Sequence, residues 1–458
     1  MAVFTSRQAT AQTRLTVASY SLSHPTAISH MQRHHVLEPA RWRAKRVPNA
    51  AIPSQHGQQG PRKICLFGLF GMDNYGHDGS LEAMLIFLRQ TWPDANYACI
   101  CVDPEKIQRR FAIAAAPISW SGFTNRFLRL CDKAMGGVPR KLANWVVAVN
   151  HLWNFDVLIV PGTFTLCDHR SDSLGVPYAV FRWASAAKFC GTKVFFINTG
   201  AGPIHRRLNR AMLTCAARSA HYRSFRDFVS KNYLTGLGID TRMDAVYPDL
   251  AFRLPTPPSR SAERDRPTTI GIGLMDYNGW HGHAAPDAAI YGTYLMKMVE
   301  VSTALISQGY RIRLLAGEIA DQRTVADLCA ILAKRGYPVS PGDGQIVTAP
   351  VYSLHDLMRQ IQDTDIVVAS RFHSVICALK MAKPTLAIGY EAKHRALMAD
   401  FGFADFCQHI EKFDVGRLLE QIALLLRNTA QYEGLIKQRL ADIDCLLAQQ
   451  ERRLTEIM

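Results

Sequence analysis

The most informative stretch of the sequence is Val367-Val-Ala-Ser-Arg371-Phe372-His373-Ser374. An apolar run ends at Ala369, and polar side chains follow where a helix is expected to begin. A second apolar run, Pro384-Thr-Leu-Ala-Ile388, leads into Gly389-Tyr390-Glu391-Ala392-Lys393. Short apolar runs between helices predict a parallel sheet covered on both faces. Because such sheets bind ligands at the carboxyl ends of their strands, this stretch also predicts where the site lies.

The same alternation runs from residue 63 to the end of the chain and is interrupted once, by a segment rich in proline, serine and arginine. It predicts an α/β fold with two Rossmann-like domains and a cleft between them. The expected strands are 63–68, 97–102, 155–160, 193–197, 268–274, 310–316, 365–369 and 385–388. The expected helices are 80–88, 177–190, 205–218, 292–308 and 322–335. The expected parts are an N-terminal extension (1–61), a first domain (62–254), a linker (255–267), a second domain (268–413) and C-terminal helices (414–458).

Composition places the chain among soluble globular proteins, with 48% hydrophobic and 20% charged residues. No apolar stretch is long enough to predict a transmembrane helix. The formal net charge is +15, and residues 1–63 carry nine basic side chains and one acidic one. We expect this N-terminal segment to be disordered. It could be a targeting peptide, or the product of an overlong gene start with Met31 as the true start.

The charge favours an anionic substrate or membrane surface as partner, and no nucleic-acid-binding motif is visible. Eleven cysteines are scattered without a CxxC pair. This pattern predicts free thiols in a reducing compartment, and therefore a cytoplasmic protein without a zinc site.

An arginine, a histidine and a lysine at strand ends predict a site for a small anion beside a proton-transfer group. Arg371 and Lys393 would bind the anion, because helix N-termini and cations attract it. His373 is the candidate acid or base, with a pKa lowered by its place at a helix N-terminus. The alternative for His373 is a structural role. Arg226, after the run Tyr222-Arg-Ser-Phe225, could join them, or could instead form a surface pair with Asp227.

Three further loops end strands at the same predicted edge. In Gly68–Ser80, the glycines would let backbone N–H groups face a ligand, and Asn74 and Asp78 could bind sugar hydroxyls; alternatively Asp78 or Ser80 caps the next helix. Thr163 and Asp168 lie in a loop that could equally be an ordinary connection. Asp249 could act in the site or cap a turn.

Residues 121–153 combine Phe123, Phe127, Trp145 and Trp153 with five basic residues. This predicts either a membrane-surface patch, peripheral at the inner face of the membrane, or a helix docked on the protein's own core.

The chain resembles the polysaccharide pyruvyl transferases from Lys63 to about Phe403. The resemblance rests on motifs in the family's order: Gly71–Leu81, Gly162-Thr163, Gly200-Ala-Gly-Pro-Ile204, Ser224-Phe-Arg226-Asp227, Pro248-Asp249-Leu-Ala-Phe252, Ser370–Ser374 and Tyr390-Glu-Ala-Lys393. It implies a GT-B type enzyme that moves the pyruvyl group of phosphoenolpyruvate onto two hydroxyls of a sugar, free or lipid-linked, as a cyclic ketal. Phe164 stands where the family pattern suggests glycine.

The resemblance also implies roles for individual residues. Arg226, Arg371, the Phe372 amide, His373 and Lys393 would bind phosphoenolpyruvate in the second domain. His373 would be the acid/base, and Asp78, Asp168 or Asp249 the base. Asn74, Thr163, Asp168 and Asp249 would face the acceptor in the first domain. Phosphoenolpyruvate is a co-substrate, and no metal or other cofactor is expected. The alternatives are a nucleotide-sugar glycosyltransferase of GT-B type and a non-enzymatic polyanion- or membrane-binding protein.

Overall fold

The computed structural model describes residues 61–168, 175–258, 266–279, 287–340 and 344–458. Residues 59–458 form one compact unit, which contains both sheets. The predicted extension 1–61 lies outside the described residues except for its last position. The central part of the predicted linker, 259–265, lies outside them as well.

The first α/β domain is built on a parallel sheet with strand order β3-β2-β1-β4-β5-β6-β7. Its strands are β1 (Lys63–Phe67), β2 (Asn96–Cys101), β3 (Ala114–Pro117), β4 (Val157–Pro161), β5 (Lys193–Thr199), β6 (Tyr222–Phe225) and β7 (Ala245–Val246). Its helices are α1 (Tyr75–Thr91), α2 (Pro104–Phe111), α3 (Arg126–Ala134), α4 (Val138–Leu152), α5 (Val176–Phe189), α6 (Arg207–Ser219), α7 (Phe228–Gly236) and the short 3-10 helix η1 (Leu250–Arg253).

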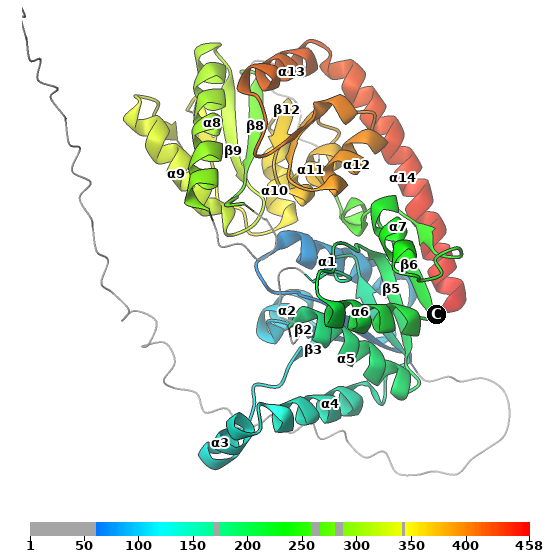
Figure 1. The fold of residues 1–458 in the computed structure, drawn as a ribbon. Helices are drawn as coiled ribbons and strands as arrows, with labels where there is room; N and C mark the ends of the chain where they lie inside the picture. Colours follow the sequence, from blue (N-terminus) through cyan, green and yellow to red (C-terminus); the bar gives the residue numbers. More distant parts are fainter. Residues whose placement is uncertain (1–60, 169–174, 259–265, 280–286, 341–343) are drawn as a thin grey trace, which may run out of the picture. The chain divides into compact units, whose positions relative to one another are not determined.

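The second domain repeats this architecture, with strand order β10-β11-β9-β8-β12-β13-β14 and parallel pairing throughout (Figure 1). Its strands are β8 (Thr269–Leu274), β9 (Arg311–Ala316), β10 (Val339–Ser340), β11 (Ile346–Thr348), β12 (Ile366–Ala369), β13 (Thr385–Gly389) and β14 (Cys407–His409). Its helices are α8 (Ala288–Ser307), α9 (Asp321–Lys334), α10 (Leu354–Gln362), α11 (Phe372–Lys380), α12 (Ala392–Asp400), η2 (Ala404–Phe406) and α13 (Val415–Arg427), followed by the terminal helix α14 (Thr429–Ile457).

The central strands consist of continuous apolar sequence. Helices cover both faces of each sheet, so no side of these strands faces water. Every residue of β12 is buried, as is every residue of β4 and β8. This is the pattern expected of a parallel sheet. The prediction of two Rossmann-like α/β domains is therefore confirmed.

Sequence reasoning placed the start of α1 too late. The helix begins at Tyr75 rather than Ser80, because the Asn74 side chain caps it by accepting hydrogen bonds from the backbone N–H groups of Gly76 and His77. The segment expected to be a ligand-facing glycine loop is therefore partly helix. The expected caps, Asp78 and Ser80, lie inside α1. Strand β3 was missed because its sequence, Ala-Ala-Ala-Pro, lacks the β-branched and aromatic residues typical of strands.

The terminal helix α14 returns from the second domain to the first (Figure 1). Near its end, the buried Gln450 side chain donates to Ser224 Oγ at 2.9 Å and also bonds Asn198 Oδ1. Arg253, at the end of η1, forms a two-point ion pair with Glu451 at 2.8 Å. The predicted C-terminal helices thus complete the packing of the first domain.

Candidate active site

The structure brings five of the predicted site residues together where strands of both sheets end. Arg226 directly follows β6, and its guanidinium carbon lies 4.9 Å from the centre of the Phe372 ring at the start of α11. The Lys393 ammonium, in the first turn of α12, lies 5.4 Å from the same ring. Asp249 and His373 complete this group, which we call the cation cluster.

Arg226 is the centre of the cation cluster. Its side chain is 3% exposed, and its Nη1 lies 3.5 Å from Asp249 Oδ2. Its Nε and Nη2 are buried and have no hydrogen-bond partner among the described residues. Buried donors are nearly always satisfied, so an unfilled buried guanidinium indicates a place for an anion. The Arg226–Asp227 pair considered from the sequence does form, with Asp227 Oδ2 3.5 Å from Nε, but it is buried rather than at the surface.

Phe164 closes one side of the cation cluster. Its ring centre lies 5.3 Å from the Arg226 guanidinium carbon and 5.1 Å from Lys393 Nζ. A Cβ at Gly200 would approach the Phe164 ring to 2.4 Å, and one at Gly202 to 2.1 Å. The ring therefore fits only because both positions are glycine. The departure from the family pattern at residue 164 lies in the site itself.

His373 is held against α1 of the first domain. A Cβ added at Gly76 would lie 2.0 Å from His373 Nδ1, so the missing side chain of Gly76 makes room for the imidazole. His373 Nε2 is buried and has no hydrogen-bond partner among the described residues. Burial lowers the pKa of His373 to about 4; the negative charge of Asp249 opposes this shift, and the charges of Arg226 and Lys393 add to it. The imidazole is therefore neutral near pH 7.

Lys393 is also removed from water. Its side chain is 14% exposed and pairs with Glu391 at 2.8 Å. Burial lowers the pKa of Lys393, while the adjacent Glu391 carboxylate opposes the shift. The lowered pKa values of Lys393 and His373 have the same main cause, which is the burial of both groups away from water.

Arg371 lies in a separate ion-pair group. Its Nε is 2.9 Å from Asp321 Oδ2, and its Nη2 is 2.7 Å from Asp321 Oδ1 and 2.5 Å from Glu318 Oε1. Asp321 is fully buried. The sequence predicted that Arg371 would bind a substrate anion, but the structure gives its guanidinium two carboxylate partners from the protein.

Glu318 is the residue that sequence reasoning missed. It follows β9 by two positions, and its Oε2 accepts a hydrogen bond of 2.9 Å from Asn74 Nδ2 of the first domain. Burial raises its pKa to about 7, although Arg371 opposes the shift. A carboxyl group that titrates near neutrality can take up and release protons during turnover. Its position two residues after the end of β9, a strand of the same sheet as β12, was the available signal.

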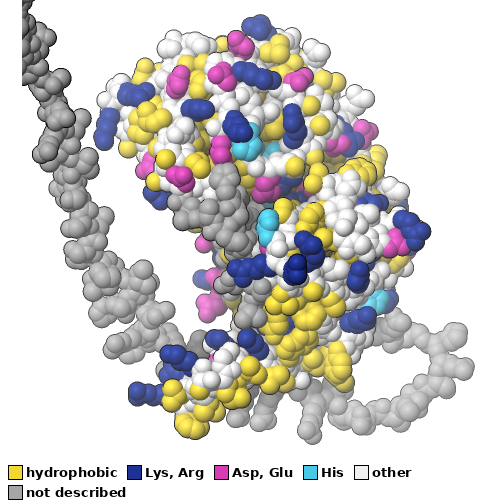
Figure 2. Space-filling model, viewed as in Figure 1, with side chains coloured by type: hydrophobic (Ala, Val, Ile, Leu, Met, Phe, Trp, Pro, Cys, Tyr) yellow, Lys and Arg dark blue, Asp and Glu magenta, His cyan; other side chains and the backbone are white. Residues whose placement is uncertain are grey.

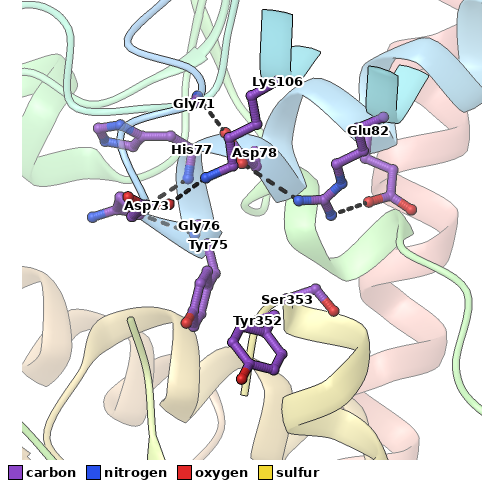
Figure 3. A network of polar contacts seen from close by, with 12 residues as sticks. Gly71, Asp73, Tyr75, Gly76, His77, Asp78, Glu82, Lys106, Tyr352 and Ser353 are labelled. Carbon is purple, nitrogen blue, oxygen red and sulfur yellow. Dashed lines mark hydrogen bonds and ion pairs between the residues drawn. The ribbon is translucent and has the colours of Figure 1, made fainter. Parts of the chain in front are cut away.

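Asn74 and Asp78 have structural partners, and Figure 3 shows the contact between Asp78 and Gly71. Both ends of the Asn74 carboxamide are used, by the α1 cap and by Glu318. Asp78 Oδ1 accepts from the Gly71 N–H at 2.8 Å, and its Oδ2 lies 3.4 Å from Arg110 Nη1. Burial raises the pKa of Asp78. These bonds hold the turn before α1 and leave neither side chain aimed at the cation cluster.

Thr163 and Asp168 shape the neighbouring loop. Thr163 is buried with a left-handed backbone (φ 56°), and its carbonyl accepts from the Gly200 N–H at 2.8 Å. Asp168 Oδ2 accepts from the His205 N–H at 2.7 Å. Asp249 Oδ1 caps η1 by accepting from the Ala251 N–H at 3.0 Å, as the alternative reading suggested. These bonds position the loops around Phe164 and Arg226.

An open depression of about 640 Å³ lies between α2 of the first domain and α10 of the second. Its lining includes Arg110 and Lys106 on one side and Tyr352 and His355 on the other. Arg110 also contacts Asp78, so the depression adjoins the turn before α1. Within the described ranges, no group of three or more His, Cys, Asp or Glu side chains could hold a metal ion. No helix among those described is both long and apolar enough to cross a membrane.

Solved structures of low sequence identity share this fold. The putative UDP-N-acetylglucosamine 2-epimerase from Listeria monocytogenes superposes with a TM-score of 0.56 at 12% identity, covering 87% of this chain and 98% of that chain. A glycosyltransferase from Rickettsia africae gives 0.54 at 13% identity, covering 87% and 97%. The UDP-GlcNAc 2-epimerase from Neisseria meningitidis, bound to UDP-GlcNAc, gives 0.52 at 12%, covering 82% and 94%. These likenesses establish the GT-B type fold and nothing about the reaction.

The sequence matches no curated protein. The family model described as polysaccharide pyruvyl transferase matches residues 74–392, which include the cap of α1, Arg226, Asp249 and the start of α11. This match covers most of the chain and runs through both sheets. The protein therefore belongs to the polysaccharide pyruvyl transferase family and is a transferase.

Proposed function

We propose that the protein transfers the pyruvyl group of phosphoenolpyruvate to two hydroxyls of a sugar in a polysaccharide or glycolipid precursor, forming a cyclic ketal. The observation that carries this proposal is the buried guanidinium of Arg226, whose Nε and Nη2 have no hydrogen-bond partner among the described residues and which shares the Phe372 ring with Lys393. A small molecule with a phosphate and a carboxylate supplies the negative charge that this enclosed group lacks.

In the proposed reaction, a proton adds to C3 of phosphoenolpyruvate and C2 becomes electron-deficient. One sugar hydroxyl bonds to C2 and loses its proton. The second hydroxyl then bonds to C2 while the C2–O bond to phosphate breaks, so that inorganic phosphate leaves and the ketal closes. The enzyme must therefore deliver one proton and accept two.

Two groups have the properties needed for these proton transfers. His373 is neutral in the unliganded site, and the negative charge of a bound donor would raise its pKa, so that binding would load the proton that C3 receives. Glu318, with a pKa of about 7, can accept a hydroxyl proton. We prefer Glu318 to Asp78, Asp168 and Asp249 for this role, because its pKa lies near neutrality and its bonds are to the side chains of Asn74 and Arg371 rather than to backbone N–H groups.

Arg226 and Lys393 would hold the phosphate and carboxylate of the donor. Both charges lie over the rings of Phe164 and Phe372, and they would stabilise charge that moves onto the departing phosphate. Arg371 would support the site indirectly by fixing Glu318 and the start of α11.

Donor binding by the full chain tests this proposal. Phosphoenolpyruvate should raise the melting temperature, because binding at 100 times Kd adds about 2.7 kcal/mol of stability. UDP- and GDP-sugars should not. Arg226→Gln should abolish the shift, whereas Arg242→Gln, which removes an exposed arginine paired with Asp240, should leave it unchanged. A shift with a nucleotide sugar alone would instead support the glycosyltransferase alternative.

A further inference from the structure

Helices α3 and α4 expose apolar side chains that a folded domain normally buries. Nine of the 21 large hydrophobic side chains exposed in the described residues lie between residues 127 and 153. They are Phe127, Leu128, Leu130, Met135, Val138, Leu142, Val146, Val147 and Trp153, and together they form what we call the α3–α4 surface. Figure 2 shows hydrophobic side chains gathered over these two helices, with Lys and Arg side chains beside them.

The spacing in α4 shows that this exposure is a continuous stripe. Asn144, Ala148 and Leu152 are buried on one side of the helix. Val138, Leu142 and Val146 recur every four residues and are exposed. An amphipathic helix docked only on its own core would carry polar residues at those positions. Helix α4 is therefore apolar on a side that the described residues leave uncovered.

Of the four aromatic residues singled out from the sequence, two fit a helix docked on the protein's own core and two fit a membrane-surface patch. Trp145 packs edge-on against Phe181 at 5.8 Å, and Phe123 packs against Trp120 at 4.8 Å. Phe127 and Trp153, by contrast, are 70% and 64% exposed. Part of the segment is docked on the protein, and part of it faces outward.

The charge around the α3–α4 surface has one sign. Arg126, Arg129, Lys133 and Arg140 are exposed along α3 and the start of α4. The single acidic residue between 121 and 153, Asp132, is 9% exposed and accepts a hydrogen bond from the Arg140 N–H at 2.9 Å. Asp132 also forms an ion pair with the Arg140 side chain at 3.7 Å, so the cations offered to a partner beside the apolar side chains are Arg126, Arg129 and Lys133.

We propose that the α3–α4 surface docks on an anionic lipid bilayer, with its apolar side chains in the headgroup region and its basic side chains paired with lipid phosphates. Apolar area and cationic charge on adjoining positions are what interfacial binding requires. A second copy of the chain fits less well, because a self-complementary interface would bring two cationic segments together. The inference does not depend on the proposed donor.

Vesicle flotation of the full chain tests the inference. The probes are vesicles of phosphatidylcholine alone and vesicles with about 30% phosphatidylglycerol. The decisive variant is the triple change Leu130→Ser, Leu142→Ser and Val146→Ser, which keeps every charge, including those of the basic N-terminal segment. The matched control is Leu208→Ser, Met243→Ser and Leu435→Ser, which removes three exposed apolar side chains elsewhere.

We expect the wild type and the control to float with the anionic vesicles, and the triple variant to lose on the order of tenfold or more in partitioning. Binding should also weaken at high salt. Wild-type protein that does not float, or a triple variant that floats like wild type, would overturn the proposal. If the wild type does not float but is a dimer in light scattering, and the triple variant is a monomer, the surface binds a second copy of the chain. That result would also overturn the membrane proposal.

Discussion

The approach of Gly76 to His373 leads to a sharp prediction for Gly76→Ala. The added Cβ would lie 2.0 Å from His373 Nδ1, where ordinary contact begins at 3.4 Å, so the imidazole must retreat by about 1.4 Å. A displacement of about 1 Å in a reacting group can cost on the order of 100-fold in rate. Alanine is also favoured over glycine in a helix by about 0.5–1 kcal/mol. We expect a folded protein that has lost about 100-fold or more in turnover.

Two measurements check this prediction. Release of phosphate from phosphoenolpyruvate, with an acceptor that supports wild-type turnover, reports the rate. NMR titration of the histidines, with His373→Asn for assignment, reports the pKa of His373, which should rise from about 4 toward its ordinary value of 6.5 as the ring leaves its enclosed position. The control is Gly292→Ala in α8, where an added Cβ has no neighbour within 4 Å. Wild-type turnover and an unchanged His373 pKa in Gly76→Ala would refute the reasoning.

Three other outcomes follow from the site. Arg371→Ala should lower the free energy of unfolding by about 3–5 kcal/mol in urea, because it strands the buried Asp321 carboxylate; a loss under 1 kcal/mol would contradict this. Because the folded protein raises the pKa of Glu318, this group adds stability that is fully present below about pH 4.5 and is lost as the pH rises through 7. Over that range the free energy of unfolding of the wild type should fall by up to about 3 kcal/mol relative to that of Glu318→Gln. Parallel curves of unfolding free energy against pH would rule this out. Phe164→Ala should open the cation cluster and raise the pKa of Lys393, and an unchanged pKa by chemical-modification kinetics would count against it.

Local sequence was sufficient to predict the central strands of both sheets and the group at the start of α11. The apolar runs of β12 and β13 and the polar residues after them have a pattern that only strand ends in a parallel sheet produce. The same reasoning found Arg226 and Lys393, because each follows a strand. The structure adds that both charges lie over the Phe372 ring. No local pattern predicts this shared contact, because the two residues are 167 positions apart.

The roles of the other site residues depend on contacts between segments that are distant in the sequence. The sequence predicts that Asn74 binds sugar hydroxyls, but its carboxamide caps α1 and donates a hydrogen bond to Glu318, 244 positions away. Gly76 was read as a source of backbone freedom, but it serves as space for His373. Glu318 itself follows an ordinary strand, and its raised pKa arises from burial among groups contributed by other strands. These assignments required the tertiary structure because burial and partner choice set them.

The return of α14 to the first domain has a consequence for the order in which the molecule can be made. Asn198 and Ser224 are buried, and they share Gln450 as a hydrogen-bond partner more than 220 residues later in the chain. During synthesis the ribosome exposes the first sheet long before it releases this glutamine. The first domain must therefore wait for the two hydrogen bonds from Gln450 until that residue emerges. Termination before Gln450 would leave the earliest-made part of the protein without these two hydrogen bonds.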